Sequence, residues 1–299
     1  MLSKGLIDDL IIRYPELEDY FVLAEDVLIA SDFREKKEDD EFWGISFLLS
    51  DLDSIQSFDY YRIDIKKRYN YINKEIKYSA FNPDEKRPEL LNEFINAADT
   101  IRGILFNFVI DSSFVSIFND SESERKKLKG LSRYKFNDYQ KLELFSHLVG
   151  IVISSIKSKI VSLKWITDKD NLLNNPKRKK ISYEYLFNTI DEYKGANNIM
   201  YEFIDPNLDS PDMILADLSN ISDLIVGPMV DIYNQYLRDD IEITADGVSF
   251  PTATKFKAIS YSEWFFSNYK NLKKVNYMTW FDPKSNQINF TEIHPKWDK

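Results

Sequence analysis

Short apolar runs that end at acidic residues mark the first part of the chain and predict β-strands. The run at 26–32 is continuous and ends in an aspartate, which is typical of a strand buried on both faces. A second apolar run follows at 42–49, and polar and apolar residues alternate at 58–65. Because these three segments are close together in the sequence, they predict an antiparallel meander.

Helices and strands alternate further along the chain. The predicted pairs are a helix from Pro88 and a strand at 104–110, a helix at 137–159 and a strand at 160–166, and a helix at 183–193 and a strand at 199–204. A strand that follows a helix suits a parallel crossover connection. The strands at 104–110 and 160–166 are therefore expected to enter the sheet through parallel connections.

The last long helix is predicted at 210–233, where Ser-Pro-Asp at 210–212 forms a typical helix start. Apolar residues recur every three or four positions, and Pro228 is expected to kink or end the helix. Asp217 interrupts the apolar pattern and lies in or beside the face meant for the core. A buried carboxylate is costly unless it is paired, hydrogen-bonded or bound to a metal. Asp217 is thus either an acid at the border of the apolar face, bonded to a nearby amide, or a functional residue.

Composition narrows the classes of function. The chain has 299 residues, of which 43% are hydrophobic, so it is long enough to bury a large core. It has no cysteine, which excludes disulfides, thiolate zinc sites and a cysteine nucleophile. Its two histidines, His147 and His294, leave little choice for a histidine-rich metal site or a catalytic triad, and His147 is expected to be structural or at the surface. Any metal would be held by carboxylates, whose oxygen atoms suit Mg²⁺ or Mn²⁺.

The net charge of -10 argues against a strong nonspecific nucleic-acid binder, although a local basic groove is compatible with it. Basic residues mixed with tyrosines at 66–78 fit either a surface that grips a single strand or a solvated loop with tyrosines packed beneath it. A second basic run lies at 177–180. The chain starts without a signal peptide and its apolar runs are too short to span a bilayer, so a soluble cytoplasmic protein without membrane contacts is expected.

Three of the predicted strands stop at an aspartate, namely Asp32, Asp111 and Asp168. The carboxyl ends of parallel strands meet at one edge of an open sheet, and ligands bind there. If these strands are neighbours, their terminal aspartates converge, and Asp217 would complete an acidic cluster. Such a cluster is commonly neutralised by two divalent cations roughly 3.5–4 Å apart. The alternative is that each aspartate caps a turn or a helix.

The predicted order of three strands followed by alternating helices and strands is that of ribonuclease H. Within that superfamily the chain resembles the bacterial domain-of-unknown-function 3800 family over residues 24–236. The resemblance rests on short segments: VLIASDF at 27–33, EIKYS at 75–79, the strand end at 164–168, and ILADL at 214–218. The last of these, an apolar pair followed by Ala, Asp and Leu, is the best match. The first departs from the usual acid and small polar signature of the family, since Ser31 precedes Asp32 here.

The resemblance implies an α/β fold with a ribonuclease-H-like mixed sheet flanked by helices at 26–236. A helical extension at 1–25 would precede this domain, and an aromatic-rich extension at 237–299 would pack on it. By position, the resemblance implies that metal is bound by Asp32, Asp168 and Asp217. It also implies that Lys77 contacts phosphate and that Glu75 is a ligand or orients Lys77. Asp111 is added to the predicted metal ligands because it lies at a strand end.

The function implied by this resemblance is a nuclease that hydrolyses phosphodiester bonds with Mg²⁺ or Mn²⁺, with antiphage defence or a mobile element as its setting. Whether its substrate would be DNA or RNA stays open. The alternative is a catalytically degenerate protein on the same fold. Such a protein would bind a partner or act as a sensor subunit through its acidic surface or its aromatic tail.

Overall fold

A computed structural model of the chain describes residues 12, 25–35, 40–78, 88–112, 131, 134–156, 159–167, 173, 175, 177–195, 198–205, 209–238, 261, 264–267, 271–282 and 287–292. The helical extension predicted at 1–25 lies outside these residues, apart from its positions 12 and 25. None of the helices in the described ranges has the length and apolar character that a bilayer crossing requires.

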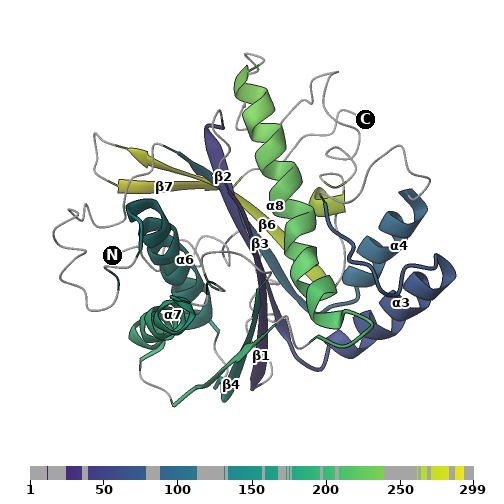
Figure 1. The fold of residues 1–299 in the computed structure, drawn as a ribbon. Helices are drawn as coiled ribbons and strands as arrows, with labels where there is room; N and C mark the ends of the chain where they lie inside the picture. Colours follow the sequence, from purple (N-terminus) through teal and green to yellow (C-terminus); the bar gives the residue numbers. More distant parts are fainter. Residues whose placement is uncertain are drawn as a thin grey trace.

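A mixed sheet of seven strands forms the centre of the molecule, in the order β5-β4-β1-β2-β3-β6-β7. The strands are β1 (Asp26–Arg34), β2 (Phe42–Asp51), β3 (Gly103–Asp111), β4 (Ser162–Thr167), β5 (Met200–Ile204), β6 (Leu272–Asp282) and β7 (Gln287–Glu292). β2 is antiparallel to β1 and β3, and β7 is antiparallel to β6. β4 is parallel to β1, β5 to β4, and β6 to β3. Helices cover both faces, so the fold is mixed α/β (Figure 1).

The segment at 58–65, predicted as the third strand, is instead part of helix α3 (Ile55–Arg68). The buried side chains of this helix recur every three or four positions, as on one face of a helix: Ile55, Phe58, Arg62, Ile65 and Lys66. Alternation of polar and apolar residues predicts a strand because the polar side chains are assumed to face solvent. Here Arg62 is instead fully buried. The strand prediction was therefore wrong because the buried face of α3 includes two cations, Arg62 and Lys66.

β3 takes the third place in the meander, although it follows helix α4 (Pro88–Ala98). It pairs antiparallel with β2, so the parallel connection expected into the strand at 104–110 was wrong. The parallel arrangement predicted for the strand at 160–166 is confirmed, because β4 lies parallel to β1. Since β2 is antiparallel to both of its neighbours, β3 points in the same direction as β1, and their carboxyl ends share one edge.

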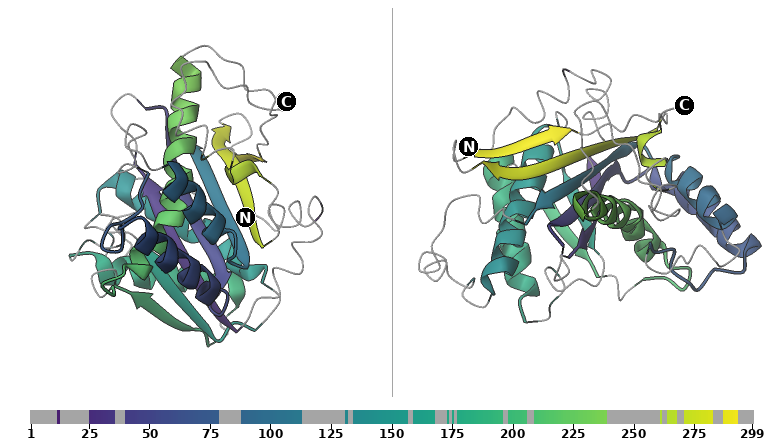
Figure 2. Two further views of the ribbon diagram at one scale, coloured as in Figure 1. Left: turned by 90° about the vertical axis from the view of Figure 1, so that its right-hand side faces the viewer. Right: turned by 90° about the horizontal axis from the view of Figure 1, so that it is seen from above.

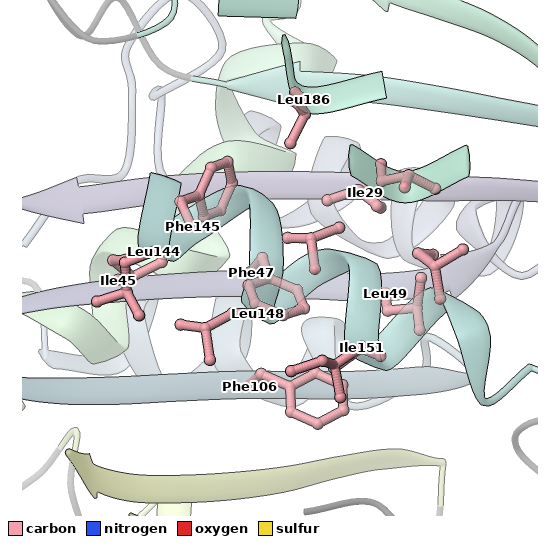
Figure 3. Close-up of a cluster of buried hydrophobic side chains, with 14 of the residues drawn as sticks. Ile29, Ile45, Phe47, Leu49, Phe106, Leu144, Phe145, Leu148, Ile151 and Leu186 are labelled. Atoms are coloured by element: carbon pink, nitrogen blue, oxygen red, sulfur yellow. The ribbon is translucent and has the colours of Figure 1, made fainter. Parts of the chain in front are cut away.

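Two apolar cores lie on opposite faces of the sheet because the side chains of each strand alternate. On one face, Ile29 and Phe47 pack under α6 (Phe136–Ser154) and α7 (Lys179–Lys194) (Figure 3). On the other face, Leu28 and Ala30 pack with α3, α4 and α8 (Ile214–Arg238). Figures 1 and 2 show α6 and α7 on one side of the sheet and the other three helices on the opposite side.

Helix α8 starts later than predicted and passes through its proline. Its first amides are capped by Asp209, whose carboxylate accepts hydrogen bonds from the backbone N–H groups of Leu215 (3.0 Å) and Ala216 (2.9 Å). The helix does not end at Pro228. Apolar side chains on both sides of this proline are buried in the same core, which compensates for the one backbone donor that proline lacks.

The C-terminal part of the chain extends the same sheet. β6 pairs with β3, and β7 continues from β6. Lys274 of β6 lies 3.0 Å from the buried Asp99 carboxylate, which also accepts a hydrogen bond from the Trp264 indole at 2.9 Å. These contacts connect the chain beyond residue 237 to the end of α4.

Candidate functional site

The strand ends predicted to converge do share one edge of the sheet. Asp32 lies near the carboxyl end of β1, and Asp111 is the last residue of β3. Thr167, the last residue of β4, is the register partner of Ser31. Because β1, β3 and β4 run in one direction, these positions lie at the same edge. Asp168 follows Thr167 directly and lies outside the described residues.

Asp32 belongs to the face of β1 that α8 covers. Leu28 and Ala30 pack on that face, and Arg34, the next residue but one after Asp32, donates a hydrogen bond to Asp231 of α8 at 3.0 Å. Since side chains alternate along a strand, Asp32 points to the same side. It is only 8% exposed. The structure therefore places this predicted ligand between the sheet and α8.

Asp217 lies in the first turn of α8 and is bound to two buried cations of α3. Its Oδ2 atom is 2.6 Å from Lys66 Nζ and 2.9 Å from Arg62 Nη1. We call these three residues the Asp217 cluster. Burial raises the pKa of Asp217 to about 6, and the attraction of the two cations offsets that effect only in part. The cluster joins α8 to α3, and the role of Asp217 as a metal ligand stays a prediction.

The Asp217 cluster lies away from the strand ends. α8 runs alongside β1 in the same direction, because Ser222 donates a hydrogen bond to the Ala30 carbonyl at 2.9 Å and Asp231 accepts one from Arg34 further on. Asp217 precedes Ser222 by more than one turn, which places it about 8 Å further from the carboxyl end of β1 at about 1.5 Å per residue. The structure thus does not bring Asp217 to the level of Asp32.

Asp223 is a second acid of α8, and the sequence reasoning missed it. It directly follows Ser222, and the twist of about 100° per residue puts it about 120° around the helix from Asp217. The backbone N–H of Tyr78 donates a hydrogen bond to Asp223 Oδ2 at 2.7 Å. The signal was present in the sequence, since residues 221–224 repeat the order of apolar, small, Asp and Leu found at 215–218.

Glu75 and Lys77 lie beside α8 because Tyr78 follows them. The Lys77 ammonium is 2.6 Å from Glu75 Oε2, and both side chains are partly exposed. Ile76 between them is fully buried, which turns its two neighbours away from the core. The structure therefore brings the predicted pair Glu75 and Lys77 to the same part of α8 as Asp223.

Three of the five basic residues at 66–78, including Lys77, form ion pairs within the protein. Lys66 belongs to the Asp217 cluster, and Arg68 pairs with Asp64 and Glu93. Tyr71 and Tyr78 are buried. These contacts favour a loop with tyrosines packed beneath it over a surface that grips a nucleic-acid strand.

The basic run at 177–180 also forms ion pairs. Arg178 lies 2.8 Å from Asp138, and Lys179 lies 3.0 Å from Asp205. The more exposed Lys180 is 3.7 Å from Glu184. This run is therefore balanced locally by acids.

His147 is packed between α6 and α7. Its Nδ1 atom is 2.9 Å from the Tyr193 hydroxyl, and burial lowers the pKa of the imidazole to about 4. The side chain is thus neutral near pH 7 and serves the packing of the two helices.

Asp32, near the carboxyl end of β1, and two residues of α8 carry oxygen donors of the kind that hard divalent cations bind. Asp32 and Asp223 supply carboxylates, and Asn220 lies one turn before Asp223 on the same side of α8. Asn220 is 1% exposed, and its amide has no hydrogen-bond partner within the described part of the chain. Among the described residues, no group of three or more acidic or histidine side chains could hold a metal. A complete set of acidic ligands would therefore need an acid from outside the described residues, and Asp168 is the one that the strand-end pattern predicts.

No protein-family model matches this chain, and no curated protein matches it.

Proposed function

We propose that the chain is a divalent-metal-dependent nuclease with a ribonuclease-H-like fold, which hydrolyses phosphodiester bonds. The observation that supports this most is the arrangement of five strands in the order β3-β2-β1-β4-β5, in which β2 alone runs against the others. This arrangement is the one expected for a ribonuclease-H-like sheet. In addition, α8 returns to cover β1 and carries Asp223 toward the strand ends, where open α/β sheets bind their ligands.

In this proposal Asp32, Asp223 and Asp168 hold the cation, and the Asn220 amide oxygen supplies a neutral donor beside them. The cation, when bound, would activate a water molecule and stabilise the leaving oxygen of the phosphodiester. Asp223 takes the place first assigned to Asp217, because Asp217 is already neutralised by Lys66 and Arg62.

Lys77 would bind the phosphate of the substrate through its partly exposed ammonium group. Glu75, at 2.6 Å, orients that group. A charged donor beside a phosphate forms a stronger hydrogen bond than a neutral one, so this lysine contributes to substrate binding. The setting in antiphage defence or a mobile element rests on the family resemblance alone.

A catalytically degenerate protein that binds a partner is the second candidate. Two observations favour it: the Asp217 cluster replaces a metal ligand with an ion pair, and the described residues contain no group of three ligand side chains. The net charge of -10 would then serve a partner with a basic surface.

Cleavage of labelled DNA and RNA oligonucleotides, single-stranded and double-stranded, with Mn²⁺ tests the proposal. We expect the wild type to cleave at least one of them, and Asp32→Asn and Asp223→Asn to lose about a hundredfold or more of that activity. Asp64→Asn, on the exposed side of α3, is the matched control and should keep it. A wild type that cleaves none of these substrates would contradict the nuclease proposal, and full activity in Asp223→Asn would remove that residue from the site.

A further inference from the structure

Tyr78 contacts α8 at two acidic side chains. Its backbone N–H donates to Asp223 Oδ2 at 2.7 Å, and its hydroxyl donates to Asp231 Oδ2 at 3.0 Å. We call Tyr78, Asp223 and Asp231 the tyrosine bridge. Burial and the nearby Asp231 carboxylate raise the pKa of Tyr78 well above its usual range, so the hydroxyl keeps the proton that it donates.

The ring of Tyr78 fills the space between these two acids. It lies over Gly227, where a Cβ atom would come within 2.5 Å of the ring carbon Cδ1. Glycine at this position therefore leaves room for the ring against the helix. On its other side the ring meets Tyr261 edge to face, with 5.4 Å between the ring centroids. Tyr78 is only 3% exposed as a result.

The tyrosine bridge is also connected to β1. Asp231 accepts the Tyr78 hydroxyl through one carboxylate oxygen and the Arg34 guanidinium through the other, both at 3.0 Å. Arg34 is the last residue of the strand that carries Asp32. The Asp231 carboxylate thus holds Tyr78, and with it the segment at 75–78, in position relative to both α8 and the carboxyl end of β1.

We propose that Tyr78 is a positioning residue that holds the Glu75–Lys77 pair beside Asp223 and so sets where Lys77 meets the phosphate of a nucleic-acid backbone. This inference rests on the proposed function for the role of Lys77. Lys77 precedes the bonded amide of Tyr78 directly, so a shift of that amide moves the lysine backbone with it. The two anchors, amide and hydroxyl, prevent the segment from sliding or rotating on α8.

Two tyrosine-to-phenylalanine variants separate this role from packing. Tyr78→Phe removes only the hydroxyl that reaches Asp231. Tyr261→Phe is the matched control, because Tyr261 is fully buried against the same ring and its hydroxyl has no hydrogen-bond partner among the described residues. Each is made alone and in a Lys77→Ala background. The readouts are steady-state cleavage of an oligonucleotide with Mn²⁺ and hydrogen exchange of the backbone amide at position 78.

We expect Tyr78→Phe to raise KM for the oligonucleotide about tenfold, the loss typical of a hydrogen bond to a charged group, with kcat changed less than about twofold. In the Lys77→Ala background the same substitution should change KM less than about twofold, because a residue that acts only through Lys77 has no effect without it. The amide at position 78 should exchange about tenfold faster in Tyr78→Phe than in Tyr261→Phe.

An equal rise of KM with and without Lys77 would overturn the inference, since Tyr78 would then act by another route. Unchanged exchange at position 78 would overturn it as well, whatever the activity. If the wild type cleaves no oligonucleotide, the proposed function fails on its own. Hydrogen exchange then still shows whether the hydroxyl of Tyr78 holds this segment on α8.

Discussion

Two of the acids of α8, Asp217 and Asp223, lie less than two turns apart and are held by different kinds of partner. Lys66 and Arg62, both buried, bind Asp217 through their charged groups. At Asp223 one donor is the neutral backbone N–H of Tyr78. An ion pair compensates the charge of a carboxylate, whereas a hydrogen bond from a neutral amide mainly orients the group. The comparison indicates that Asp217 contributes to stability, and Asp223 is the acid that we propose as a metal ligand.

The largest expected effect is the loss of stability when Asp217 is replaced. Asp217→Ala leaves Lys66 and Arg62 buried without their shared partner, which should lower the free energy of unfolding by about 3–5 kcal/mol. Asp64→Ala on the exposed side of α3 should cost less than about 1 kcal/mol. Urea denaturation followed by circular dichroism measures both. Equal costs for the two variants would show that the Asp217 cluster contributes no more than a surface pair.

The second effect concerns the metal. At a concentration of Mn²⁺ a hundredfold above its dissociation constant, binding should stabilise the wild type by about 2.7 kcal/mol. We expect Asp32→Asn and Asp223→Asn to lose this gain and Asp217→Asn to keep it. Thermal unfolding with and without Mn²⁺ measures the difference. Loss of the gain in Asp217→Asn alone would return the metal to the acid that the sequence first indicated.

The stability of the protein should depend on pH through Asp217. Burial raises the pKa of this carboxyl from its unfolded value of 3.8 to about 6 in the folded protein. The unfolded chain therefore releases this proton first, and the stability contributed by the group is complete below about pH 4 and is lost as the pH rises through about 6. The difference in unfolding free energy between the wild type and Asp217→Asn should fall over this window. A flat difference would contradict the raised pKa.

The smallest effect on stability is expected for Arg34, which donates a hydrogen bond to Asp231 of the tyrosine bridge. Arg34 and Asp231 are about a quarter exposed, so Arg34→Ala should lower stability by about 1 kcal/mol or less. In this variant the backbone amide at position 78 should nevertheless exchange faster, because Asp231 loses one of its two hydrogen-bond donors. Exchange that is unchanged there, with the stability loss present, would separate Asp231 from the positioning of Tyr78.

Local sequence patterns located most of the elements, but not the partners of the acids on α8. β1, β2 and β4 are short apolar runs, and burial on both faces makes such runs visible without knowledge of their neighbours. The segment at 58–65 misled the prediction because Arg62 reads as a solvent-facing residue until its buried partner on α8 is known. Asp217 was chosen because its segment at 214–218 resembles the family motif, and the similar pattern at 221–224 was missed.

The sequence by itself determined the composition of the cores, the absence of cysteine chemistry, and a carboxylate as the only abundant metal donor. These follow from residue type and spacing alone. Only the tertiary structure decided which acid of α8 meets buried cations and which meets the segment that carries Lys77. The physical reason is that the cations and the Tyr78 amide come from positions about 140 to 155 residues away in the chain, so no local pattern could assign them to their acids.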